Sequence, residues 1–180
     1  MYIVHDEAQL IRDCQQENVE AQKYLYEQYA QKMMGVCYRY VNDYETARDL
    51  LHDGFIKVFR YIRSFQGEGS FEGWMRRVFV TTALEYLRRN DVMNEHADLS
   101  NLFDVKSEDE SIMERLSADE LREIIGSLPT GFRTVFNLYA VEGYSHKEIA
   151  AMLGITESTS RSQFARAKTL LRQKIRTLYG

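Results

Sequence analysis

Hydrophobic and aromatic residues recur every three or four positions through much of the first ninety residues, which is the spacing of one face of an α-helix. One run covers residues 18–41. A second run follows a turn at Asn42 and Asp43, and Asp43 is a plausible N-terminal cap for it. Two glycines in residues 65–70 interrupt the pattern before a third helix over 71–89. The pattern predicts three long helices preceded by a short one.

The second half of the chain is also predicted to be helical. Residues 91–110 show no sustained period and end in an acidic run, which is typical of an exposed linker or a plain solvated spacer. Ser111 and Glu114 have the spacing of a capping box and predict the start of a new helix. Further on, Thr130 is expected to cap a helix that continues to Ala140.

Residues 142–175 have the pattern of a helix-turn-helix. Ser145 and Glu148 form a second capping-box pair, and Gly154 can adopt the left-handed conformation of a tight turn between helices. An ordinary helical hairpin with a solvated basic face would share this pattern, but the turn chemistry and the one-sided charge favour nucleic-acid binding. The pattern leaves Ser158, Arg161, Ser162, Ala165 and Arg166 on or near the open face of the second helix. Side chains of these polar kinds contact bases and phosphates, and the expected DNA-binding set is Ser158, Arg161, Ser162, Gln163, Arg166 and Lys168.

We therefore predict an all-α protein of two small helical domains, at residues 1–90 and 111–180, joined by an acidic linker at 91–110. One proline and ten glycines in 180 residues suit packed helices better than a turn-rich sheet. The amino end lacks the basic start of a signal peptide, and no uncharged apolar run approaches the roughly 18 residues that span a bilayer. A cytoplasmic location is expected, with Cys14 and Cys37 as reduced, buried thiols.

A net charge of −4 is unfavourable for a nucleic-acid binder until the charge is divided along the chain. Residues 91–131 carry three Lys/Arg against eleven Asp/Glu, whereas residues 132–180 carry eight against three. The acidity is thus concentrated in the centre, and the carboxyl-terminal part is basic enough to attract a phosphate backbone.

The sequence shows no set of residues that predicts catalysis. It has no phosphate loop of the GxxxxGK type, no HExxH zinc motif, and no cluster of cysteine and histidine with metal-ligand spacing. We expect no enzymatic activity, no metal and no cofactor.

Stretches in both halves of the chain resemble two conserved regions of one family. From Leu128 onward, LPTGFRTVFNLYAVEGYSHKEIAAMLGITESTSRSQFARAKTLLR looks like the fourth conserved region of sigma-70-type factors of the extracytoplasmic-function subfamily. Nearer the amino end, ARDLLHDGFIKVFRYIRSF and FEGWMRRVFVTTALEYLRR resemble that subfamily's second region. The resemblance implies an RNA polymerase sigma factor that binds core polymerase and directs promoter recognition, DNA opening and transcription initiation.

The resemblance also assigns roles to residues. The family docks on the polymerase through positions that match Asp49, His52, Asp53 and Lys57, although an acidic exposed face can equally be plain solvation. It captures the opened strand of the minus-ten element through positions that match Gln66, Ser70, Phe71, Arg76, Arg77, Thr81 and Arg88. The helix-turn-helix residues named above would then read the minus-thirty-five element in duplex DNA.

Departures from the family pattern leave the preferred bases open. Thr81 and Glu85 stand where relatives often carry asparagine, and Ser160 replaces the more usual valine. Phe71 and Trp74 can be core residues instead of base-stacking ones, Trp74 in particular. The resemblance further implies an anti-sigma partner, and it places the acidic linker in the polymerase's RNA-exit path.

Two alternatives stay open on the sequence alone. A conventional helix-turn-helix regulator would bind a palindromic duplex as a dimer, without being a polymerase subunit. A helical scaffold that binds only protein is the other alternative, and the positive charge of residues 132–180 argues against it.

Overall fold

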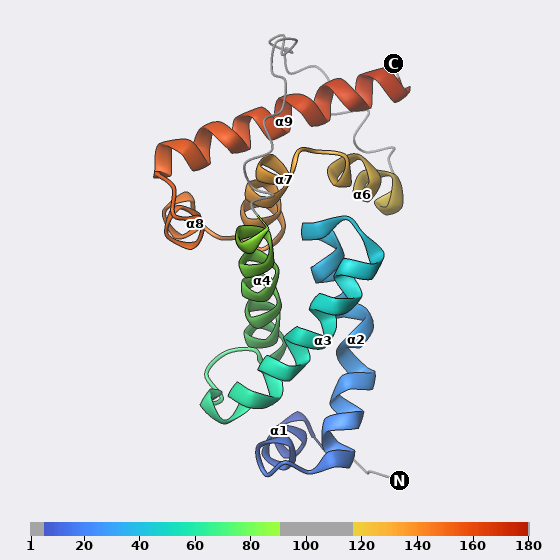
Figure 1. The fold of residues 1–180 in the computed structure, drawn as a ribbon, viewed down its shortest axis with the longest axis vertical. Coiled ribbons are helices and arrows are strands. Elements are labelled where there is room, and N and C mark those ends of the chain that lie inside the picture. Colours follow the sequence, from blue (N-terminus) through green and yellow to red (C-terminus); the bar gives the residue numbers. More distant parts are fainter. Residues whose placement is uncertain (1–5, 91–116, 180) are drawn as a thin grey trace. The chain divides into compact units, whose positions relative to one another are not determined.

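The computed structural model describes residues 6–90 and 117–179, and every regular element in them is a helix. The chain divides into two compact units, Met1–Tyr86 and Leu87–Gly180. Figure 1 shows the helices of the first unit in blue to green and those of the second in yellow to red. The acidic linker at 91–110 and the cap expected from Ser111 and Glu114 lie outside the described residues.

The first unit contains the helices expected from the hydrophobic pattern. They are α1 (Glu7–Gln15), α2 (Val19–Val41), α3 (Tyr44–Tyr61) and α4 (Phe71–Arg89), with a 3₁₀ turn, η1 (Ile62–Ser64), after α3. Asp43 caps α3 as predicted, because its carboxylate accepts a 2.8 Å hydrogen bond from the backbone N–H of Thr46.

The core of the first unit lies between α2, α3 and α4. Leu25, Phe55, Val58 and Phe79 are almost completely buried there. Gly54 allows α3 to approach Phe79 closely, since a Cβ atom at this position would lie 2.1 Å from Cε1 of the Phe79 ring. The packing of α3 against Phe79 therefore requires a glycine or a similarly small residue at position 54.

The first complete helix of the second unit, among the described residues, is α6 (Ala118–Gly126). The boundary between the two units falls within α4, so the last turn of that helix, from Leu87, is already part of the second unit. After α6 the unit continues through α7 (Thr130–Phe136), the π-helical turn η3 (Asn137–Val141), α8 (His146–Leu153) and α9 (Glu157–Tyr179). Ser117 and Glu120 form a capping box at the start of α6. The long helix α9 runs across α6 and α7 (Figure 1).

The prediction that Thr130 caps α7 is wrong. Pro129 occupies the cap position and Thr130 is the first helical residue, which is consistent with the preference of proline for helix entrances, where no backbone N–H is required. The Thr130 side chain is buried and accepts a 3.3 Å hydrogen bond from the Arg133 guanidinium. The same guanidinium donates to the backbone carbonyls of Gly126 and Leu128, and so holds the α6–α7 connection.

Candidate functional site

The helix-turn-helix predicted from the sequence is present as α8, a tight turn and α9. The Ser145 N–H donates a 2.8 Å hydrogen bond to Glu148, and the Ser145 hydroxyl accepts one from the Glu148 N–H, which confirms the capping box. Gly154 ends α8 with a φ of 67°, the left-handed conformation expected of it. Thr156 then caps α9 by accepting a hydrogen bond from the backbone N–H of Thr159.

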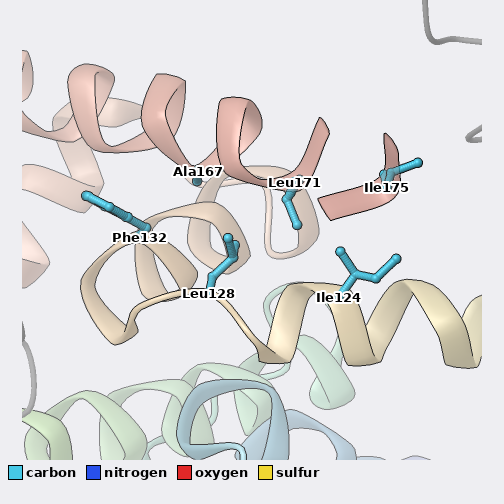
Figure 2. Close-up of a cluster of buried hydrophobic side chains, with 6 residues drawn as sticks. All are labelled: Ile124, Leu128, Phe132, Ala167, Leu171 and Ile175. Atoms are coloured by element: carbon cyan, nitrogen blue, oxygen red, sulfur yellow. The ribbon is translucent and has the colours of Figure 1, made fainter. Parts of the chain in front are cut away.

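One face of α9 belongs to the core of the second unit. Figure 2 shows Ala167, Leu171 and Ile175 of α9 with the residues of α6, α7 and the segment between them that belong to the same buried cluster. The partners in this cluster are Ile124, Leu128 and Phe132, and all six side chains are at most 9% exposed. This apolar contact fixes which face of α9 is turned away from the protein.

The other face carries most of the residues predicted to contact duplex DNA. The exposed members of that set are Ser158, Arg161, Ser162, Arg166 and Lys168. Arg161 forms an ion pair with Glu157 one turn earlier, and the Lys168 ammonium lies 5.0 Å above the centre of the Phe164 ring. These positive groups lie at the surface, in reach of a phosphate backbone.

Gln163 differs from the rest of this set. Its side chain is half-buried, and its Oε1 atom is buried without a hydrogen-bond partner in the described part of the chain. This amide oxygen is therefore turned toward the protein and is not exposed for contact with a base.

Sequence reasoning missed a polar contact inside the helix-turn-helix. His146 at the start of α8 and Ser160 on α9 are both buried, and His146 Nδ1 lies 2.9 Å from Ser160 Oγ in a hydrogen bond. The signal available in the sequence was a serine on the buried stripe of α9, where an apolar residue was expected.

In the first unit, the loop between η1 and α4 has the backbone that its glycines predict. Gly67 and Gly69 have φ values of 79° and 77°. Gln66 and Ser70 are exposed, and the Ser70 hydroxyl accepts a 3.1 Å hydrogen bond from the Gly73 N–H, which caps α4. The loop is accessible and is held at its end by this cap.

Phe71, which was assigned to the strand-capture set, is part of the buried core of the first unit. Phe71 is 1% exposed, and its ring centre lies 5.3 Å from that of Phe65 and 5.7 Å from that of Trp74. Phe71 is the first residue of α4, and its ring also meets that of Tyr29 on α2 edge to face, with 6.2 Å between the ring centres. Trp74, expected in the core, is only half-buried.

A cleft of about 230 Å³ opens between α3 and α4 beside this aromatic cluster. Its wall includes an exposed tyrosine, Tyr61, and two residues of the predicted strand-capture set, Arg77 and Thr81. Lys57 also lines the cleft and forms a 2.5 Å ion pair with Glu85. The remaining lining residues are Trp74 and Val78. The cleft therefore combines aromatic rings with both signs of charge.

The other members of the strand-capture set lie along α4. Arg76 is half-buried, and Arg88 is exposed on the last turn of the helix. The structure thus brings Arg77 and Thr81 together at the cleft, and it places Gln66 and Ser70 on the loop that precedes α4.

The predicted docking face lies on α3. Asp49, His52 and Asp53 are exposed on the side opposite the buried Leu50 and Leu51. The apolar Ile56, which the sequence analysis did not select, continues the same face one turn after His52 and is 56% exposed. Lys57, assigned to this face, pairs with Glu85 at the cleft instead of remaining with the acidic residues.

No group of three or more His, Cys, Asp or Glu in residues 6–90 and 117–179 could hold a metal ion. None of the helices in those ranges combines the length and the apolar character needed to cross a membrane.

Comparison with known families gives two matches, in the same order as the two units. The model described as "Sigma-70 region 2" matches residues 25–92, and the one described as "Sigma-70, region 4" matches residues 118–171.

Several characterised proteins are similar over most of the chain. The ECF RNA polymerase sigma-E factor of Haemophilus influenzae is 31% identical over 94% of this chain and 95% of its own length. The RNA polymerase sigma-H factor of Pseudomonas aeruginosa is 28% identical over 99% and 98%. The ECF RNA polymerase sigma factor SigE of Mycolicibacterium smegmatis is 35% identical over 82% of this chain, which spans 59% of that relative's length.

Solved structures share the fold. CnrH in complex with the cytosolic domain of CnrY matches with a TM-score of 0.51 at 19% identity, covering 93% of this chain and 96% of that one. The sigma factor RpoE in complex with the anti-sigma factor NepR, from Bartonella quintana, matches with a TM-score of 0.53 at 17% identity, covering 88% and 98%.

Proposed function

This chain belongs to the extracytoplasmic-function group of sigma-70 factors, the subunits that direct bacterial RNA polymerase to promoters, and we propose that its two units divide that work. The first unit binds core polymerase and captures the opened minus-ten strand. The second unit holds the duplex at the minus-thirty-five element. The chemistry of RNA synthesis is left to the polymerase, so the chain itself is not an enzyme and acts in the cytoplasm.

One observation carries the assignment of duplex reading to α9: its apolar face forms the core of the second unit, and its basic face is exposed. A helix anchored on one side can enter a major groove with the other side. Arg161 and Arg166 are the side chains best suited to a guanine edge, because guanidinium groups form paired hydrogen bonds with it. Ser162 and Lys168 are positioned for phosphates.

The cleft between α3 and α4 supports strand capture in the first unit. Tyr61 and Trp74 provide ring faces for an unstacked base, and Arg77 provides charge for the backbone beside it. The loop bearing Gln66 and Ser70 leads directly into α4, which carries the Trp74 wall of this cleft. A base that leaves the opened duplex would therefore meet stacking surfaces and a cation together.

The face of α3 formed by Asp49, His52, Asp53 and Ile56 is proposed to dock on the polymerase. Two carboxylates one turn apart suit a basic partner surface, and the exposed Ile56 adds an apolar contact that a merely solvated face would not need. Interfaces commonly surround such an apolar contact with charged residues, which direct the approach of the partner.

An anti-sigma protein is proposed as a further partner. The two solved structures with this fold hold CnrY and NepR respectively, and NepR is described as an anti-sigma factor. The alternative of a dimeric regulator independent of polymerase is not favoured, because both sigma regions match in order and relatives of nearly the same length are named sigma factors.

Promoter binding by reconstituted holoenzyme tests the proposal. The chain is mixed with core polymerase, and promoters are selected from duplexes randomised at the two elements. Arg161→Ala or Arg166→Ala should weaken binding of the selected duplex by about 1–3 kcal/mol if it contacts a base edge. Arg122→Ala, an exposed arginine on α6, is the matched control. Unchanged affinity in both α9 variants would overturn the assignment of α9.

Docking and strand capture are tested separately. Asp49→Lys with Asp53→Lys should reduce capture of core polymerase, whereas the same two reversals at Glu20 and Glu27, exposed on α2, should not. If both pairs retain polymerase equally, the docking face is misassigned.

For the cleft, Tyr61→Ala should reduce the permanganate reactivity of opened thymines in the promoter complex. Tyr38→Ala, which removes an exposed tyrosine from α2, is the control. Equal opening by the two variants would remove Tyr61 from the proposed capture site.

A further inference from the structure

The hydrogen bond between His146 and Ser160 joins the two helices of the helix-turn-helix at the point where the recognition helix begins. His146 is the first residue of α8, and Ser160 lies in the first turn of α9. Ser160 is 0% exposed and His146 is 9% exposed, with 2.9 Å between Oγ and Nδ1. A buried polar pair of this kind is directional, unlike the apolar contacts further along α9.

Aromatic rings hold the imidazole in place. It stacks on Tyr139 of η3, with 4.4 Å between ring centres and 13° between planes, and it meets the edge of Phe164 of α9 at 5.8 Å. The ionisable groups that face His146 are Tyr139 from η3 and Glu157 and Arg161 from α9. The ring therefore cannot turn away from Ser160 without losing these contacts.

We infer that His146 is a positioning residue for promoter reading: through Ser160 it sets the rotation of the first turns of α9, and thereby the direction of Arg161 and Ser162. The inference rests on the proposed function of α9. Because successive residues of a helix are about 100° apart, a side chain next to a fixed Ser160 has a fixed direction relative to the groove. Ser160 and Phe164 are one turn apart on the buried side, so the helix is held at two points.

The surroundings of His146 favour its neutral form. Burial lowers the pKa of His146 below its ordinary value of 6.5, the neighbouring Arg161 lowers it further, and Glu157 opposes them in part. A depressed histidine pKa means that the stabilising contribution is complete above the ordinary value and declines as the pH falls below it. Acidification would therefore disturb the joint between α8 and α9.

Threonine and valine at position 160 form a matched pair, because they have nearly the same shape and only threonine keeps the hydroxyl. Both variants are assembled with core polymerase and offered duplexes randomised at the minus-thirty-five element, and the base preferences are compared with those of the unaltered chain. Ser160→Thr should keep the preferences. Ser160→Val should change them at the positions read by Arg161 and Ser162, and should weaken the preferred site by about two- to tenfold, the equivalent of one hydrogen bond.

The pH dependence of discrimination between minus-thirty-five elements provides a readout that loss of packing alone would not alter. Between pH 7.5 and pH 5.5, discrimination between the preferred and a scrambled minus-thirty-five element should decline in the Ser160→Thr holoenzyme and stay nearly flat in the Ser160→Val one. If either substitution unfolds the second unit, His146→Phe is used in its place, because phenylalanine retains the stack on Tyr139. Its discrimination between the two elements should also stay nearly constant over this pH range.

The inference is overturned if Ser160→Val lowers affinity for all duplexes equally, or if the variants follow the same pH profile. Its failure is distinguishable from that of the proposed function, because Arg161→Ala would still weaken the preferred duplex. If Arg161→Ala and Arg166→Ala are without effect as well, the assignment of α9 itself is wrong.

Discussion

Replacing Gly54 with alanine should destabilise the first unit, whereas the same replacement at Gly35 should stabilise it. Both glycines lie inside long helices of this unit, α3 and α2, so alanine improves helix propensity by about 1 kcal/mol at either position. The surroundings differ. A Cβ atom at Gly35 would meet nothing within 4 Å, whereas one at Gly54 would lie 2.1 Å from Cε1 and 2.4 Å from Cδ1 of Phe79.

The magnitude follows from this contact. Phe79 is 0% exposed and its ring centre is 5.2 Å from that of Phe55, so it has no free space into which to retreat. Overpacking of this kind costs about 1–3 kcal/mol, and the propensity gain common to both sites cancels in the comparison. Gly54→Ala should therefore be less stable than Gly35→Ala by about 1–3 kcal/mol.

Urea and thermal unfolding of the two variants, followed by circular dichroism, measure this difference. For a unit of this size, each 1 kcal/mol shifts the unfolding midpoint by about 4–8 °C. Equal midpoints for Gly54→Ala and Gly35→Ala would refute the close approach of α3 and α4. As a further check, Phe79→Leu combined with Gly54→Ala should cost less than the sum of the two single changes, because the shorter side chain relieves the clash.

Three further predictions concern buried groups and the turn. Burial raises the pKa of Cys14 to about 11 and that of Cys37 to about 12. At pH 8 both thiols should therefore resist thiol reagents until urea unfolds the chain, and rapid labelling of the native protein would contradict this. Arg133→Ala should destabilise the second unit by about 2–4 kcal/mol, since it leaves two backbone carbonyls without their donor, and an unchanged unfolding midpoint would argue against that role. Gly154→Ala should lower the free energy of unfolding of the second unit by about 1–2 kcal/mol through backbone strain alone, and Gly154→Asn should lower it less. Equal losses in the two variants would show that the left-handed turn is not responsible.

Periodicity and capping residues were sufficient to predict most of the helices, because both depend on short-range spacing. Asp43, Ser145 and Gly154 have the roles that their positions in the chain imply. Thr130 does not, because the preceding proline already suits the helix entrance and Thr130 is turned inward to meet Arg133. The local signal at this position was ambiguous, and burial decided between the two possibilities.

The predicted site residues depend on long-range packing to different degrees. The exposed residues of α9 could be identified because their buried neighbours follow a regular stripe. Phe71 could not, because an aromatic residue beside a glycine-bearing loop suits either a core or a stacking surface until its neighbours are known. Lys57 likewise has a charge that suits the polymerase-docking face, but its partner, Glu85, is 28 residues away.

The sequence by itself determined the helical class, the helix-turn-helix and the family, since these are encoded in residue spacing along one segment at a time. Only the tertiary structure decided which side chains meet across helices: the Lys57–Glu85 pair at the cleft, the His146–Ser160 bond under the recognition helix, and the contact of Gly54 with Phe79. Such contacts depend on the rotation and separation of two helices at once. No periodicity within either helix specifies them.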